Sequence, residues 1–344
     1  MEHHNYLAKT DETYQRNRRE IERFSSTARL TPRTSIIRIP VVVHVLFNDD
    51  DENLSEAQIN SQIAALNRDF RARNDDIGNV PAPFKPFVAD PLIEFGLAVR
   101  DPNGNPTTGI TRTRTSIEEF PYDRMDPGAT AKLDKMIKQE EFGKAPWPRD
   151  QYLNMWTCTI EAGLLGYAQF PGGHASTDGV VINNTAFGTT GTARAPFNLG
   201  RTAVHEVGHF LDLLHIWGDD RGGCLGSDNV FDTPNQAGPN QGDVSLDDFP
   251  LVTCDNGPHG DMFVNYMDYV NDDTMMMFTR GQVARMNAAL AGPRKALTQS
   301  NGLTPLETER MVMGDEASRV AEAASRVTEG GTQAEKVFDG VSWV

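Results

Sequence analysis

The segment from Thr202 to Trp217, TAVHEVGHFLDLLHIW, constrains this chain more than any other stretch. Each residue of an α-helix advances by about 100°, so His205 and His209 lie on one face, one turn apart. Two imidazoles at this spacing can bind one metal ion, and the carboxylate of Glu206 then lies beside the metal without binding it. The spacing predicts a zinc site with a general base on the same helix.

A third histidine, His215, adds a condition on the backbone. A straight helix would place it about 9 Å beyond His209 along the axis. Because a zinc–nitrogen bond is only about 2.0–2.1 Å long, the chain must leave the helix and turn back near Asp212. Aspartate can adopt the left-handed conformation that such a turn needs, at a cost of about 1–2 kcal/mol. Three neutral imidazoles would leave one position open for water, as in catalytic zinc sites.

Charge and hydropathy exclude two classes of partner. A net charge of −16 over 344 residues argues against nucleic acid, which requires clustered Lys and Arg. The longest apolar run, residues 39–47, is far shorter than the roughly 18 residues of a membrane helix and predicts a buried strand. The first 15 residues lack the pattern of a signal peptide. The protein is therefore either intracellular or written without its targeting segment.

The three cysteines divide into two kinds. Cys224 and Cys254 flank a loop-rich stretch of Gly, Asp and Pro, which gains stability from a cross-link, and we interpret them as a disulfide. Cys158 lies in the apolar run LNMWTCTI and is predicted to be a buried free thiol. The alternative is a cytosolic protein with three reduced cysteines.

Strand and helix patterns alternate through the first half of the chain. Strands are predicted at residues 36–47, 93–99, 152–160, 164–173 and 179–183, and helices at 10–24, 56–70 and 133–142. Ser55 and Gln58 form a capping box for the second helix. Flanking glycines favour a sheet edge for the strand LLGYAQFPGG. The segment 216–275 is predicted to be mostly loop, with a short helix later at 316–327.

The N-terminal 33 residues are polar and cannot form a core of their own. His3 and His4 are expected in a mobile terminus. His44, His174 and His259 are interpreted as structural or surface histidines.

A second motif, NYMDY at residues 265–269, places Met267 some fifty residues after His215. With HExxHxxxxxH, it resembles the metzincin metalloproteases, whose signature HExxHxxGxxH is followed by a methionine turn. The segments PVVVHVLF, LLGYAQFPGG, TDGVVI, CLGSDNVFDTP and DMFVNYMDYVNDD extend this resemblance to the pappalysin family, over roughly residues 36–290. Two features depart from the family pattern. Asp212 replaces the glycine, and no cysteine that could cap the zinc in a pro-segment precedes Cys158.

The resemblance implies roles for particular residues. It implies a zinc site and its chemistry: ligands His205, His209 and His215, general base and acid Glu206, Met-turn residue Met267, and transition-state stabiliser Tyr269. It also implies calcium, bound by Asp228, Asp232 and Thr233, and a Cys224–Cys254 disulfide. Gly166, Tyr167 and Ala168 would belong to a rim strand that binds substrate by antiparallel strand addition.

Substrate specificity is a further expectation. Asp272 and Asp273 follow the methionine turn, in the region that walls the S1′ pocket of metzincins, and favour Arg or Lys at P1′. The alternative is that both are solvated loop carboxylates or calcium ligands. If the preference holds, the bonds before Arg29 and Arg33 are candidate self-processing sites.

These observations predict an α/β fold: a metzincin-like zincin with a twisted mixed β-sheet, backing and active-site helices, and a loop-rich C-terminal subdomain. Residues 1–33 are predicted to be a pro-segment or extension, 34–303 the catalytic domain, divided near 215/216, and 304–344 a C-terminal extension. The predicted function is zinc-dependent endopeptidase activity on proteins or peptides through a zinc-activated water, in a secreted protein with no nucleic-acid or membrane partner. An inactive zinc-binding module that acts as a secreted binding protein is the alternative, and a cytosolic maturation protease is a third interpretation.

Overall fold

The computed structural model describes residues 2–28, 33–220, 222–242 and 244–305. Its helices are α1 (Glu2–Thr10), α2 (Glu12–Thr27), α3 (Glu56–Asp69), α4 (Ala129–Ile137), α5 (Arg201–Phe210) and α6 (Arg280–Ala291). Its strands are β1 (Ile37–Phe47), β2 (Ile93–Leu97), β3 (Ile110–Arg114), β4 (Leu153–Cys158), β5 (Gly166–Ala168), β6 (Val180–Asn183), β7 (Gln241–Gly242) and β8 (Tyr269–Val270).

The chain divides into two compact units, residues 1–303 and 304–344. Only Thr304 and Pro305 of the second unit belong to the described residues, so the helix predicted at 316–327 lies outside them. Within the described residues, no helix is long and apolar enough to cross a membrane.

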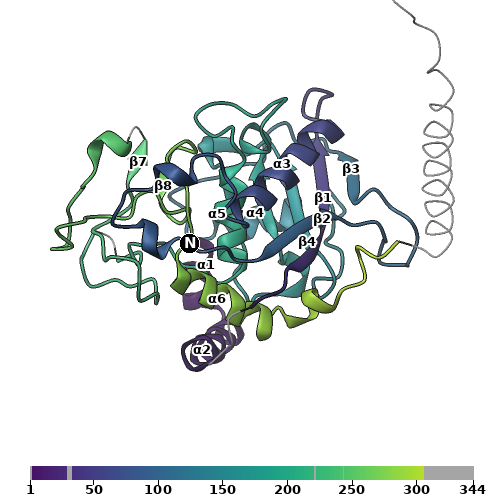
Figure 1. Cartoon of the computed structure of the whole chain (residues 1–344). Coiled ribbons are helices and arrows are strands. Elements are labelled where there is room, and N and C mark those ends of the chain that lie inside the picture. The colour runs from purple at the N-terminus through teal and green to yellow at the C-terminus, as the bar shows by residue number, and fades with distance from the viewer. Residues whose placement is uncertain (1, 29–32, 221, 243, 306–344) are drawn as a thin grey trace, which may run out of the picture. The chain divides into compact units, whose positions relative to one another are not determined.

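A six-stranded mixed sheet forms the centre of the first unit (Figure 1). Its order is β2-β1-β4-β6-β5, and β3 also pairs with β1, beyond the point where β2 ends. All neighbours are parallel except β5, which pairs antiparallel with β6 and lies at the edge. The mixed sheet and the edge position of a strand within LLGYAQFPGG are both confirmed. The strand itself is shorter than predicted, since it covers Gly166–Ala168 rather than residues 164–173.

Helices cover both faces of this sheet. The larger core includes residues of β1, α3 and α5, whereas α4 packs in a second cluster with Trp156 of β4 and Tyr167 of β5. Burial on both faces explains why β1 has an almost continuous apolar sequence rather than an alternating one. One face of the sheet thus positions α5, the helix that carries HExxH.

Several local predictions need correction. The helix predicted at 10–24 is α2, Glu12–Thr27, preceded by α1 and capped by the Asp11 side chain. Helix α4 ends at Ile137 rather than at residue 142, because the chain turns back so tightly that Gly143 packs on the Ile137 carbonyl, where a Cβ would lie only 2.0 Å away. At the start of α3, Ser55 accepts a hydrogen bond from the Gln58 amide as predicted. The Gln58 side chain instead donates to the Phe187 carbonyl (2.9 Å), so only half of the capping box forms.

The N-terminal segment packs on the rest of the unit, which contradicts the expectation that His3 and His4 lie in a mobile terminus. His3 is buried, with Nε2 3.6 Å from the Asp134 carboxylate. The His4 ring lies 4.8 Å from that of Phe170, and its Nδ1 lies 2.6 Å from the Tyr14 hydroxyl. The segment forms no core alone, but α2 packs against α6.

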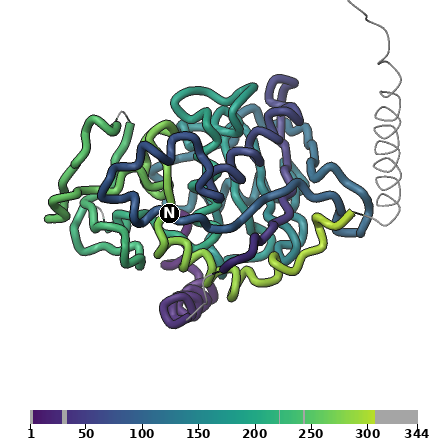
Figure 2. The backbone as a smooth tube through the Cα atoms, viewed as in Figure 1, coloured from purple at the N-terminus to yellow at the C-terminus, as the bar shows by residue number. Residues whose placement is uncertain are grey.

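The segment 216–275 is mostly loop, as predicted, and its green backbone lies at one end of the unit (Figure 2). The Cys224–Cys254 disulfide cross-links it, with Cα atoms 5.3 Å apart. Cys158 is a buried free thiol. Both cysteine predictions are confirmed.

Candidate active site

Helix α5 begins with a network of buried charges. The Asp272 carboxylate accepts hydrogen bonds from the Leu199 amide (2.7 Å) and the Arg201 amide (3.3 Å), which satisfies donors at the helix start. The Arg201 guanidinium binds both carboxylate oxygens of Asp76 and the Asp272 carbonyl. These contacts fix the axis of the helix one turn before its first histidine.

The three histidines of the motif converge on one point. The Nε2 atoms of His209 and His215 are 3.1 Å apart, and those of His215 and His205 are 3.3 Å apart. Four-coordinate zinc with Zn–N bonds of about 2.1 Å places its ligand nitrogens about 3.4 Å from one another. The spacing therefore fits three ligands of one zinc ion, and among the described residues this is the one group of three or more His, Cys, Asp or Glu so arranged.

The hydrogen-bond partner of the outer nitrogen of each ring is compatible with a cation at this point. Nδ1 of His205 faces the Tyr266 carbonyl (2.8 Å), and Nδ1 of His209 faces the Leu213 carbonyl (2.8 Å). Nδ1 of His215 faces the Asp219 carboxylate (2.9 Å). Since these oxygens only accept, each Nδ1 carries the proton and each Nε2 presents a lone pair. Three converging lone pairs repel one another unless a metal ion binds them.

Burial keeps these imidazoles neutral, as ligation requires. It lowers the pKa of His205 to about 4 and the pKa values of His209 and His215 well below their ordinary value. The role of Asp219 as the partner of His215 was not predicted from the sequence. Its only signal was an acidic residue four positions after the third histidine.

The turn between the second and third histidine occurs where the spacing required it. Helix α5 ends at Phe210, and Asp212 has a φ of 78°. The Asp212 amide donates to the His209 carbonyl (3.0 Å). The predicted left-handed aspartate is therefore confirmed, and it directs His215 back towards the metal position.

Glu206 lies next to the rim strand. It is buried, and burial raises the pKa of its carboxyl to about 8, so a neighbouring cation is needed to keep it ionised at neutral pH. A Cβ on Gly166 of β5 would lie 3.1 Å from the Glu206 Cγ and 2.9 Å from the Val181 carbonyl. The absence of a side chain at Gly166 allows the strand to lie directly against the glutamate.

Met267 lies against the backbone of the zinc helix, and Tyr269 lies beside two of the three histidines. A Cβ on Gly208 of the zinc helix would meet the Met267 sulfur at 2.5 Å, so the buried methionine lies directly against the helix backbone. The Tyr269 ring is partly exposed, with its centroid 4.7 Å from that of His215 and 5.5 Å from that of His205. These positions are compatible with the Met-turn and transition-state roles expected from the sequence, which stay predictions.

The other predicted site carboxylates differ in their surroundings. Asp273 is exposed, whereas Asp272 is buried at the start of α5. Asp232 accepts hydrogen bonds from the Thr279 hydroxyl and the Gly281 amide, which hold the start of α6. Asp228 accepts from the Thr233 hydroxyl (2.7 Å) and the Val230 amide (3.0 Å). The four acids thus do not form one cluster.

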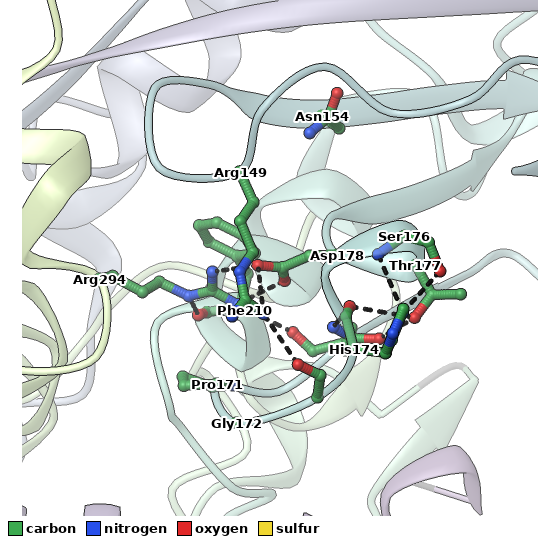
Figure 3. A network of polar contacts seen from close by, with 12 residues as sticks. Arg149, Asn154, Pro171, Gly172, His174, Ser176, Thr177, Asp178, Phe210 and Arg294 are labelled. Carbon is green, nitrogen blue, oxygen red and sulfur yellow. Dashed lines mark hydrogen bonds and ion pairs between the residues drawn. The ribbon is translucent and has the colours of Figure 1, made fainter.

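A buried arginine joins the end of the rim segment to the end of the zinc helix. Arg294 forms two 3.0 Å contacts with the Asp178 carboxylate, and its guanidinium lies over the Phe210 ring at 3.3 Å (Figure 3). It also donates to the carbonyls of Phe210 and Gln169. Residues 169–178 are therefore held against α5. Within this segment, the Phe170 ring packs on the His209 ring, with the two centroids 5.0 Å apart.

Replacing Asp219 with alanine is expected to weaken zinc affinity about 10–100-fold, because the His215 ring loses the acceptor that fixes its tautomer and orientation. Competition with a chromogenic chelator measures this affinity. Asp273→Ala is the matched control, since that carboxylate is exposed. Equal zinc affinity in the two variants would show that Asp219 does not orient His215.

A zinc peptidase that cleaves extended chains uses three features: neutral zinc ligands that leave one coordination position open, a carboxylate beside the metal, and an unpaired strand edge to which the substrate can add. The described residues of this protein provide all three. Its left-handed turn and buried methionine further place it among the metzincin zinc metallopeptidases.

Comparison with known proteins identifies the family. The Peptidase M43 family model, described as pregnancy-associated plasma protein-A, matches residues 136–291. An extracellular metalloprotease of Pyricularia oryzae is 31% identical over 277 residues, covering 76% of this chain and 78% of the relative. The chain belongs to this family, the pappalysins, and is a zinc metalloendopeptidase.

Two solved structures are also similar. Mature mirolysin of Tannerella forsythia, in complex with a cleaved peptide, is 48% identical with a TM-score of 0.73, covering 80% of this chain and 100% of that one. A mutant of promirolysin from the same organism is 44% identical with a TM-score of 0.79, covering 88% and 97%. The second alignment extends over more of this chain than the first.

Proposed function

We propose that this chain is the latent form of a secreted endopeptidase that cleaves extended peptides before basic residues. The observation that carries the proposal is the edge strand β5 beside Glu206 and the three histidines, because β5 has no pairing partner on its outer side among the described residues. A substrate strand can add there antiparallel, with its scissile carbonyl near the metal position. Extracellular relatives and a solved complex of mirolysin with a cleaved peptide support this proposal.

The chain's own residues supply the proton transfers. His205, His209 and His215 would hold the zinc ion, which would supply Lewis-acid polarisation of the scissile carbonyl and a lowered pKa of the attacking water. Glu206 accepts a proton from the attacking water and delivers it to the leaving amine. Tyr269, beside His205 and His215, donates a hydrogen bond to the developing oxyanion.

Asp272 supports the basic P1′ preference better than Asp273 does. One oxygen of its carboxylate binds the amides at the start of α5, whereas the other, Oδ1, is buried without a hydrogen-bond partner among the described residues. A guanidinium or ammonium group of substrate would satisfy that oxygen. Asp273 is exposed and offers no comparable site.

A cleavage profile on a peptide library tests this preference. Processed wild-type protein should show Arg and Lys enriched at P1′, and Asp272→Asn should reduce the enrichment roughly tenfold to a hundredfold, since hydrogen bonds to charged groups contribute about 1.5–3 kcal/mol. Asp273→Asn should leave the profile unchanged. A wild-type profile without basic residues at P1′ would exclude the proposal.

We also propose that residues 1–33 form an inhibitory pro-segment removed by cleavage before Arg29 or Arg33. The packing of His4 on Phe170, which itself packs on His209, supports this role. So does the similarity to promirolysin over most of the chain. Wild-type protein incubated alone should acquire Arg29 or Arg33 as its new N-terminus, and Glu206→Ala should not. Identical processing of the two proteins would exclude self-cleavage.

Calcium in the loop from 227 to 233 is a separate proposal. Burial raises the pKa of Asp228 to about 7, as for a carboxylate that lacks a cation, although its oxygens bind the Thr233 hydroxyl and the Val230 amide. Added calcium should raise the midpoint of thermal unfolding in the wild type by mass action. Calcium should not raise the midpoint of Asp228→Asn. An equal rise of the midpoint in wild type and variant would show that calcium binds outside the loop from 227 to 233.

A further inference from the structure

The guanidinium of Arg18, on α2, occupies a site built by three neighbouring groups. Its Nη1 lies 2.5 Å from Oδ1 of Asp212 and donates to the Pro171 carbonyl at 3.2 Å. Its Cζ lies 5.2 Å from the centroid of the Phe170 ring. The Asp212 side chain is 0% exposed and that of Arg18 only 11%, so this contact is not a solvated surface pair.

The three groups belong to the segments that hold the zinc site. Asp212 is the left-handed residue between the second and third histidine. Phe170 and Pro171 follow the rim strand, and the Phe170 ring packs between His4 of α1 and His209. None of the three ligates metal, and none belongs to the proposed S1′ pocket.

A second arginine completes the surroundings of Asp212 from the other side. Arg285 of α6 lies 3.1 Å from Oδ2 of Asp212 and donates to its carbonyl at 2.6 Å. The same guanidinium binds Glu22 of α2 through two contacts of 3.0 and 2.6 Å. Helix α2 therefore meets the catalytic domain at two ion pairs, one direct and one through Arg285.

The chemistry of the site selects arginine. Nη1 alone donates to both the Asp212 carboxylate and the Pro171 carbonyl, which a lysine ammonium could also do. The planar guanidinium can in addition lie on the face of the Phe170 ring, a contact that a compact ammonium group does not match. Asp212 also adopts a backbone conformation that glycine adopts more readily. A glycine would satisfy the turn and remove the carboxylate, so the carboxylate has a use beyond the turn.

We propose that Phe170, Pro171 and Asp212 form a guanidinium-binding site whose ligand is Arg18, and that this site latches α2 onto the catalytic domain. This inference rests on the proposed function, because the contact can regulate activity only if the N-terminal segment is inhibitory. The latch makes the turn of the zinc motif the docking point of the N-terminal segment. Release of α2 would leave Arg285 as the partner of the Asp212 carboxylate among the described residues.

Hydrogen exchange of the full chain tests the latch in a Glu206→Ala background, where self-cleavage cannot interfere. Arg18→Met should speed exchange of the α2 amides roughly tenfold to a hundredfold, the equivalent of one lost hydrogen-bonded charge pair. Arg18→Lys should recover only part of the protection. Arg19→Met, which removes an exposed arginine from the same helix, is the matched control.

Two further measurements make each outcome decisive. Asp212→Asn should speed exchange of the α2 amides less in the Arg18→Met background than in the parent, because the Arg18–Asp212 pair is already lost there and only the contacts through Arg285 and Ser25 remain to be weakened. Zinc content should remain that of the parent. Equal exchange in Arg18→Met and Arg19→Met would overturn the latch. So would faster exchange in β1 as well as α2, because the effect would then be global.

Failure of the latch and failure of the proposed function give different results. If zinc-loaded protein with Glu206 intact hydrolyses no peptide, but Arg18→Met still loosens α2, the latch stands and the peptidase proposal falls. If the wild type is an active peptidase but Arg18→Met leaves α2 protected, only the latch falls.

Discussion

Replacing Glu206 with glutamine is expected to lower kcat/KM for a quenched peptide substrate by about 10²–10⁴-fold, the usual contribution of a positioned general base and acid. Glutamine preserves the volume of the side chain and its contact with Gly166, but it cannot take up a proton. The three histidines and their Nδ1 partners are unchanged. Zinc content should therefore match that of the wild type, and the loss should appear in kcat.

The control for this experiment is Glu161→Gln. Glu161 is an exposed glutamate shortly before the rim strand, so its variant experiences the same purification and processing without touching the zinc site. Because the latent chain could mask activity, all variants are first trimmed to a common N-terminus by an external protease. Activity of fully zinc-loaded Glu206→Gln within tenfold of the control would exclude the assigned role.

The zinc site was predictable because its determinants are local. A helix fixes His205 and His209 relative to each other, and the Zn–N bond length then requires a turn before His215. The structure places that turn at Asp212 with a φ of 78°. The apolar run of β1 predicted a buried strand for the same reason, since a pattern within one element suffices.

Long-range partners could not be predicted in this way. Helix α1 and strand β3 have little apolar periodicity, and they form because neighbours are available: β3 pairs with the second half of β1, and α1 packs on α4. Helix α6 begins with a capping box, Thr279 and Gln282, which was not among the predicted elements. Arg285, on this helix, lies between Asp212 and Glu22, and no local pattern predicts such a long-range contact.

The roles of the acidic residues were the least predictable part of the site. The sequence marks Asp232 and Asp272 equally as ligands or pocket residues, yet both carboxylates bind backbone amides at helix starts. A helix N-terminus, a metal and a basic substrate all attract carboxylates. Only the position of the other oxygen, such as the unpartnered Oδ1 of Asp272, separates these uses.

Arg201→Met should destabilise the protein by about 3–5 kcal/mol, the usual effect of removing one partner from a buried ion pair. Arg201 is 2% exposed and binds Asp76 through two hydrogen bonds of 2.6 and 2.7 Å. Its Nε lies 3.5 Å from the buried carboxylate of Asp69. Methionine fills a similar volume, so the loss would come from carboxylates left without their cation rather than from a cavity.

Urea unfolding of zinc-loaded protein measures this loss as a change in the free energy of unfolding. Arg38→Met is the control, because that arginine is largely exposed in its pair with Glu94 and should contribute about 1 kcal/mol or less. Since Arg201 is the first residue of α5, zinc affinity should fall together with stability. A variant that loses stability but binds zinc normally would show that the charges at the helix start support the fold without positioning His205 and His209.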